Sequence, residues 1–148
     1  YDPINAVSAM ARICDANETH DGHKSFADAH PTESAVGAAT AALAKRTGAA
    51  SIIALTYSGY SSEILSACRP AAQIIAATPS QETARRLRLY WGVTPLVCQR
   101  DVDMNVAVDD AFNAALDAGL VQFNELVVVC ASRENIRSAA DTIWVHNA

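Results

Sequence analysis

Cysteine pairs, basic runs and long apolar segments are all missing from this chain of 148 residues, and each absence excludes a class of protein. The apolar runs are broken well before the roughly 20 residues that a membrane span needs, so we expect neither a span nor a signal peptide. With only 11 lysines and arginines and a net charge of -5, the chain also lacks the basic face that nucleic acid requires. Membrane and nucleic-acid partners are therefore not expected.

The cysteines do not form a disulfide or zinc-binding pattern. They lie far apart in or beside apolar segments, and none belongs to a C-x-x-C pair: Cys14, Cys68, Cys98 and Cys130. Isolated apolar cysteines are typical of buried free thiols in a reducing compartment. The sequence thus predicts a cytoplasmic protein that folds without disulfides, and its 51% apolar residues suffice for one ordinary core.

Metal-binding and catalytic motifs are also absent. His20, His23 and His30 share a polar stretch with Asp21 and Asp28, but without a fixed metal-ligand spacing, so a solvated loop is expected rather than a metal site. The chain contains no G-x-S-x-G, P-loop, G-x-G-x-x-G or H-E-x-x-H sequence. We therefore expect no catalytic residue, no metal and no cofactor in this chain, which alone should be inactive.

Helical and strand patterns alternate along most of the chain. Apolar residues at helical spacing, capping residues and short β-branched runs predict helices over 3–16, 32–45, 60–68, 103–118 and from Ser80 onward, and strands over 50–56, 73–77, 93–98, 126–130 and 142–146. Thr32 and Asp103 are the expected caps of two of these helices. Residues 17–31 carry little periodicity and are predicted to be a linker.

This order predicts an α/β fold. Strand 50–56 is an unbroken apolar run, as expected when helices cover both faces of a parallel sheet. We therefore expect a three-layer α/β/α sandwich with a five-stranded, mostly parallel sheet. Residues 1–31 are assigned to a helix and linker, and 32–148 to the domain itself.

The segment 56–62 is the strongest candidate site. It joins the first strand directly to a helix, and its sequence Thr-Tyr-Ser-Gly-Tyr-Ser-Ser supplies hydroxyls and one glycine. A helix N-terminus with small residues can hold a phosphate through backbone N–H groups. We predict that an anion contacts the following residues: Thr56, Ser58, Gly59, Tyr60, Ser61 and Ser62. The alternative is that Ser58 and Ser61 only cap the helix.

A second loop is expected to bring cations to the same place. If the first and fourth strands are neighbours where the winding of the sheet reverses, the 56–62 loop faces residues 131–141, which include Arg133 and Arg137. Guanidinium groups there would bind a second anion, so the pair of loops favours a sugar phosphate. The denser basic cluster Arg85, Arg86 and Arg88 fits a solvated helix face, with an anion or subunit contact as the alternative.

Several stretches in one order resemble the C-terminal domain of pyruvate kinase. They are the Tyr-x-Pro-x-x-Ala-Val-x-x-Met-x-x-Ile pattern from Tyr1 and the segments 33–36, 52–59, 69–70, 84–95, 119–121 and 125–129. The similarity spans nearly the whole chain, and ordered motifs are far more specific than any single loop. It agrees with the α/β/α sandwich expected above, and it implies that the last strand of the sheet is antiparallel.

The resemblance carries functional implications. In pyruvate kinases a preceding barrel domain, which binds magnesium and potassium, transfers phosphate from phosphoenolpyruvate to ADP in glycolysis. Residues 3–16 would be the last helix of that barrel. The C-terminal domain forms a subunit interface of a tetramer and often binds a phosphorylated effector at the loop matching 56–62, so the implied partners are other pyruvate kinase domains and subunits and a sugar phosphate.

The sequence also departs from the family. Many effector-responsive members carry a basic residue where this chain has Tyr57 or Tyr60, and their last loop is often rich in glycine, whereas residues 132–139 here contain none. These departures favour a monophosphate, or no effector, over fructose 1,6-bisphosphate. A stand-alone phospho-ligand module and a purely structural interface domain remain the alternative functions.

Overall fold

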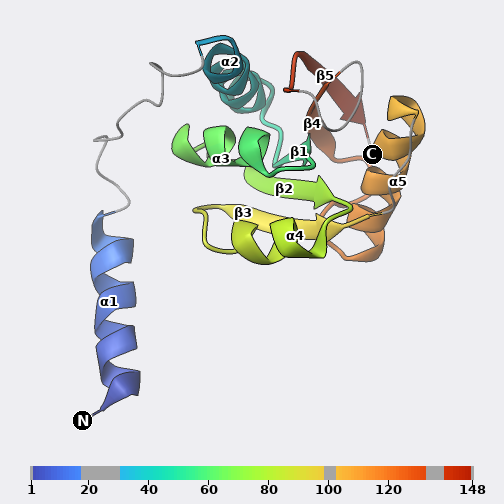
Figure 1. Cartoon of the computed structure of the whole chain (residues 1–148). Coiled ribbons are helices and arrows are strands. Elements are labelled where there is room, and N and C mark those ends of the chain that lie inside the picture. Colours follow the sequence, from blue (N-terminus) through green and yellow to red (C-terminus); the bar gives the residue numbers. More distant parts are fainter. Residues whose placement is uncertain (1, 18–30, 99–102, 133–138, 148) are drawn as a thin grey trace.

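The computed structural model describes residues 2–17, 31–98, 103–132 and 139–147 (Figure 1). Its helices are α1 (Pro3–Asn17), α2 (Pro31–Thr47), α3 (Tyr60–Ala67), α4 (Gln81–Leu87) and α5 (Met104–Asp117). Its strands are β1 (Ser51–Leu55), β2 (Gln73–Thr78), β3 (Val93–Val97), β4 (Leu126–Ala131) and β5 (Thr142–Asn147). Every predicted helix and strand is confirmed, with ends that shift by a residue or two.

Capping side chains explain where several helices begin. The Asp2 carboxylate accepts from the Asn5 N–H at 3.1 Å, and the Ser80 hydroxyl accepts from the Thr83 N–H at 3.2 Å. The Asp103 carboxylate accepts from the Asn105 N–H at 2.8 Å, which confirms its predicted cap. The cap predicted at Thr32 is wrong, because α2 already begins at Pro31, a residue whose fixed φ suits a first helical turn.

The five strands form one sheet in the order β3-β2-β1-β4-β5. The β1, β2, β3 and β4 pairings are parallel, and β5 runs antiparallel to β4. The chain therefore moves from β1 outward through β2 to β3, then crosses back to place β4 on the other side of β1. This arrangement confirms both the predicted α/β sheet and the reversal of winding between β1 and β4.

Side chains that alternate along the central strands pack into two separate hydrophobic cores. Ile53, Ile75 and Val129 face α5, whereas Ile52, Ile74 and Val128 face the side covered by α2 and α3. All six side chains are at most 1% exposed. Because both faces are dry, the central strands carry apolar residues at every position, as a doubly covered sheet requires. The layers of Figure 1 confirm the predicted three-layer sandwich.

Helix α1 differs from the rest of the described chain, since none of its residues is buried. Its apolar stripe is exposed to between 62% and 78% at Ile4, Val7, Met10 and Ile13. The predicted helix is therefore present, but it contributes nothing to the two cores. In the described ranges, no helix has the length and apolar character to cross a bilayer.

Candidate functional site

The 56–62 segment lies where the winding of the sheet reverses. It leaves the carboxyl end of β1, the strand between β2 and β4, and enters α3 directly. Ligands of open α/β sheets bind at such points, because the adjacent loops diverge to opposite faces. The topology thus puts the predicted loop at the expected place.

Gly59 makes the sharp turn into α3 possible. It is the N-cap residue, with φ of 90°, a left-handed conformation that a side chain disfavours. Its N–H donates to the Thr56 hydroxyl at 2.9 Å, a contact that closes the turn. The helix cap therefore comes from a glycine. Ser58 adds only a 3.4 Å contact from the Tyr60 N–H to its hydroxyl, and Ser61 lies inside the first turn.

Helix α4 holds the 56–62 loop through two hydrogen bonds to backbone carbonyls. The Thr83 hydroxyl donates to the Tyr57 carbonyl at 3.0 Å, and the Arg86 guanidinium donates to the Ser58 carbonyl. With these two carbonyls directed to α4, the N–H groups of Ser61 and Ser62 begin α3 with no carbonyl of their own helix to bond. Such N–H groups, with the positive end of the helix dipole, are what an anion contacts.

The predicted site residues differ strongly in exposure. Ser58 is exposed, and Tyr60 and Ser61 are partly exposed, so all three can meet a ligand. Thr56 is buried and serves the turn, while Gly59 is buried against α4. The Ser62 hydroxyl is fully buried and has no hydrogen-bond partner among the described residues. The accessible residues of the predicted set are therefore Ser58, Tyr60 and Ser61.

The arginines predicted for the facing loop, Arg133 and Arg137, lie outside the described residues. The parallel pairing of β1 with β4 that their placement requires is present. Among the described residues, Arg86 is the cation that contacts the loop. The sequence predicts a solvated helix face for this arginine, with an anion or subunit contact as the alternative, and its only signal is membership of the densest basic cluster, Arg85 to Arg88.

Two carboxylates, those of Glu33 and Glu63, bring negative charge close to the loop. The pKa of Tyr60 is raised, first by loss of solvent and then by Glu33 and Glu63. The pKa of Tyr90 is raised by loss of solvent and by Glu63, while Arg86 opposes the shift. Both phenols therefore stay neutral near pH 7. The loop faces one cation and two carboxylates, so the carboxylates oppose an anion there and would oppose two phosphates more than one.

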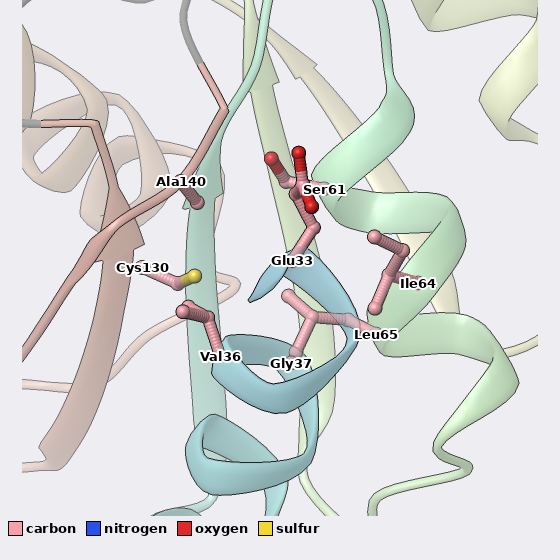
Figure 2. Close-up of a pocket in the computed structure, with 8 residues that line it drawn as sticks. All are labelled: Glu33, Val36, Gly37, Ser61, Ile64, Leu65, Cys130 and Ala140. Atoms are coloured by element: carbon pink, nitrogen blue, oxygen red, sulfur yellow. The ribbon is translucent and has the colours of Figure 1, made fainter. Parts of the chain in front are cut away.

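The groove between α2 and α3 is too small to hold a ligand. Figure 2 shows the side chains of Glu33 and Ser61 at one end of it and Cys130 among the apolar residues that line it. Its volume is about 10 Å³, which is room for a single water molecule. This groove has no room for a sugar phosphate.

No group of three or more metal-ligating side chains is found in the described ranges. The histidine-rich stretch 20–30 falls outside them. The four cysteines are free thiols, and Cys130 is buried. Burial raises the pKa of that thiol, with a smaller opposing effect from the Thr40 hydroxyl, so its thiolate is disfavoured.

Known proteins similar to this chain point to one family. The family model of the pyruvate kinase alpha/beta domain matches residues 34–146. Curated pyruvate kinases are similar: that of Clostridium acetobutylicum is 33% identical over 87% of this chain, one of Agrobacterium vitis is 35% identical over 86%, and pyruvate kinase 2 of Synechocystis is 32% identical over 97%.

The matches cover only 28%, 28% and 25% of those three relatives. The chain thus spans about a quarter of the length of the curated relatives it matches. The family model covers all of the sheet except the last residue of β5, and it includes the 56–62 loop. Together with the three-layer fold, these matches show that the chain belongs to the pyruvate kinase alpha/beta domain family.

Proposed function

We propose that this chain is the regulatory and oligomerisation domain of a pyruvate kinase, and that it binds a phosphorylated effector at the 56–62 loop. The proposal is supported by the family membership and by the matched share of about a quarter of each relative. On this proposal the remainder of the protein transfers phosphate from phosphoenolpyruvate to ADP. The magnesium and potassium of that reaction belong to the barrel rather than to this chain.

The main support for an effector site is the position of the 56–62 loop. The loop lies where the winding of the sheet reverses, and α4 holds it there through hydrogen bonds. Ser58, Ser61 and the first N–H groups of α3 supply hydrogen-bond donors, and Arg86 supplies positive charge. Because Glu33 and Glu63 lie close by, we propose a sugar monophosphate in preference to a bisphosphate. An effector that binds one subunit arrangement more tightly than another would shift the tetramer between them.

The exposed stripe of α1 supports the proposed partners. Four apolar side chains that are more than 60% exposed are expected to lie against another part of the parent protein. We propose that this part is the preceding barrel, and that residues 1–31 are its last helix and the linker. The chain alone should show no transfer from phosphoenolpyruvate to ADP in a coupled assay, whereas the full-length protein should.

The site is tested by calorimetric titration of the chain with ribose 5-phosphate, glucose 6-phosphate, AMP and fructose 1,6-bisphosphate, with inorganic phosphate for comparison. We expect saturable binding of a monophosphate, weakened about tenfold or more in Arg86→Gln, which removes a charge-assisted contact. Arg85→Gln removes the same charge from an exposed position of the same helix and is the matched control.

The outcomes separate the proposed functions. Equal weakening in Arg85→Gln and Arg86→Gln would mean that only net charge matters and that the loop is not the site. No heat with any ligand would leave a structural interface domain whose loop merely begins a helix. Binding by a chain whose gene encodes no barrel would favour a stand-alone phospho-ligand module.

A further inference from the structure

A second hollow lies at the opposite end of the sheet from the 56–62 loop. It has a volume of about 540 Å³, within the range of small-molecule sites. Its walls come from the amino ends of β1 and β2 and from the connection between α5 and β4, and the residues that matter for its chemistry are Ser51, Gln73, Gln122, Phe123, Asn124 and Glu125. The proposed effector site does not involve this edge.

The wall formed by residues 122–125 is a rigid turn. The Glu125 N–H donates to the Gln122 carbonyl at 3.1 Å, and the Gln122 N–H donates back to the Glu125 carboxylate at 2.7 Å. Asn124 has φ of 65°, the left-handed conformation found at the third position of tight turns. The Ser51 hydroxyl also donates to the carboxylate, at 3.1 Å, and ties the turn to β1.

This turn holds an aromatic ring out in solvent. Phe123 is 80% exposed, so its apolar surface gains little from the fold of this chain. Because hydrogen bonds fix the residues around it, the ring is presented by a preorganised element rather than a mobile loop. An aromatic ring presented in this way beside a hollow offers apolar contact area to a ligand.

The polar groups of the hollow are one carboxylate and several neutral side chains. The Glu125 carboxylate has two of about four acceptor positions occupied by Ser51 and Gln122. The Gln73 side-chain amide donates to the Thr94 hydroxyl at 2.9 Å, which fixes the amide and leaves its oxygen as an acceptor. The described residues that line the hollow include no lysine, arginine or histidine. A carboxylate and an aromatic face together attract a cation.

We propose that this hollow binds a guanidinium or ammonium group, held by the Glu125 carboxylate and stacked on Phe123. The same chemistry is offered by a small cationic metabolite and by an arginine side chain of another polypeptide. In either case the guanidinium or ammonium group would pair with the Glu125 carboxylate and stack on the Phe123 ring. The proposal is independent of the effector site, which lies at the carboxyl ends of the strands.

The test is titration of the isotope-labelled chain, followed through its backbone amide NMR signals. Free arginine, the blocked N-acetyl-arginine amide and citrulline are compared, since citrulline keeps the shape of arginine without its charge. We expect saturable shifts of the amides of residues 119–125 with arginine or its blocked form and none with citrulline. Binding of free arginine alone would indicate a small metabolite, and tighter binding of the blocked form would indicate an arginine side chain.

Two variants and one control connect the signal to the site. Phe123→Ala should weaken binding about two- to fivefold, because an exposed cation–π contact is modest. Glu125→Gln should weaken it about tenfold or more. Glu63→Gln removes a carboxylate near the other end of the sheet and should leave binding unchanged. Equal shifts with citrulline, or unchanged affinity in Phe123→Ala, which alters only an exposed side chain, would overturn the proposal.

Discussion

Gly59 decides the geometry of the 56–62 loop at the scale of a single residue. A Cβ at this position would lie 3.1 Å from both the Arg86 Nη2 and the Leu87 Cδ2, and 3.3 Å from the Thr83 Cγ2. The left-handed φ and the close approach of α4 therefore both require glycine. The close approach of α4 also brings the Arg86 guanidinium to the Ser58 carbonyl.

We expect Gly59→Ala to lower the free energy of unfolding by about 2 kcal/mol, because it adds crowding to backbone strain. Thermal or denaturant unfolding followed by circular dichroism measures the change. Gly48→Ala is the matched control, since Gly48 also has positive φ, 71°, but a Cβ there meets nothing within 4 Å. Equal losses in the two variants would show that contact with α4 is unimportant.

Ser62 presents the opposite case, because its buried hydroxyl has no hydrogen-bond partner in the part of the chain that the structure describes. We expect Ser62→Ala to raise the free energy of unfolding by about 1 kcal/mol, because the desolvated hydroxyl is no longer left unpaired. Denaturant titration provides the measurement. Ser61→Ala, in the same turn but partly exposed, should change stability by less than about 0.5 kcal/mol. A destabilised Ser62→Ala variant would mean that the hydroxyl has a partner, such as water, in solution.

At the scale of elements, the packing of α2 on α3 depends on Gly37. A Cβ there would lie under 3.0 Å from the Ile64 side chain, closer than real Cβ contacts come. Glycine in a helix is normally costly, so its presence in α2 is explained by this approach. The small residues of α2 let the two helices cover the sheet closely, and the groove between them is narrow as a result.

Gly37→Ala is therefore expected to destabilise the chain by about 1 to 3 kcal/mol, although alanine favours a helix. Chemical unfolding of Gly37→Ala, Ile64→Ala and the double variant measures their coupling. The double variant should lose less than the sum of the two single losses, because removing the Ile64 branches makes room for the new methyl group. Ala38→Gly, at an exposed position of α2, changes the free energy of unfolding through helix propensity alone and is the control. A stabilised Gly37→Ala variant would contradict the packing.

At the scale of the whole molecule, α1 lies outside both cores of the domain. No residue of α1 is buried, whereas both cores lie within residues 44–140. We expect deletion of residues 1–17 to leave the unfolding transition of the sheet within about 0.5 kcal/mol. Calorimetry of the two chains provides the comparison. A large drop in the unfolding temperature would show that α1 packs on the body in solution.

Stability should also fall at alkaline pH. Burial raises the pKa of Cys68, Cys98 and Cys130 above the ordinary thiol value of 9.0. Above the ordinary thiol pKa, the unfolded state releases protons that the folded state still holds. The protonated thiols therefore contribute their full share of the free energy of unfolding below that pKa, and this share is lost as the pH rises through the folded pKa. Unfolding free energies between pH 8 and 11 should decline, and less steeply in Cys130→Ala. An unchanged slope in that variant would exclude Cys130 as a source.

Much of the fold could be predicted because the local sequence patterns favour the same helices and strands that tertiary packing stabilises. The strand at 50–56 was recognisable because a sheet covered on both faces needs apolar residues at every position. Asp103 was recognisable as a cap because its carboxylate bonds backbone two residues away. The site was only partly predictable: the loop follows from local sequence, but Arg86 reaches it from a helix more than 20 residues later.

The sequence by itself determined the order of helices and strands, the antiparallel last strand, the family and the loop that begins α3, since each depends on residues close together in the chain or on ordered motifs. Only the tertiary structure decided that α4 holds this loop through Thr83 and Arg86. It also decided that the buried Ser62 hydroxyl has no partner among the described residues and that Ser51 of β1 ties down the turn at Glu125. Such contacts join distant segments or depend on burial, and local patterns carry no information about which side chains packing brings together.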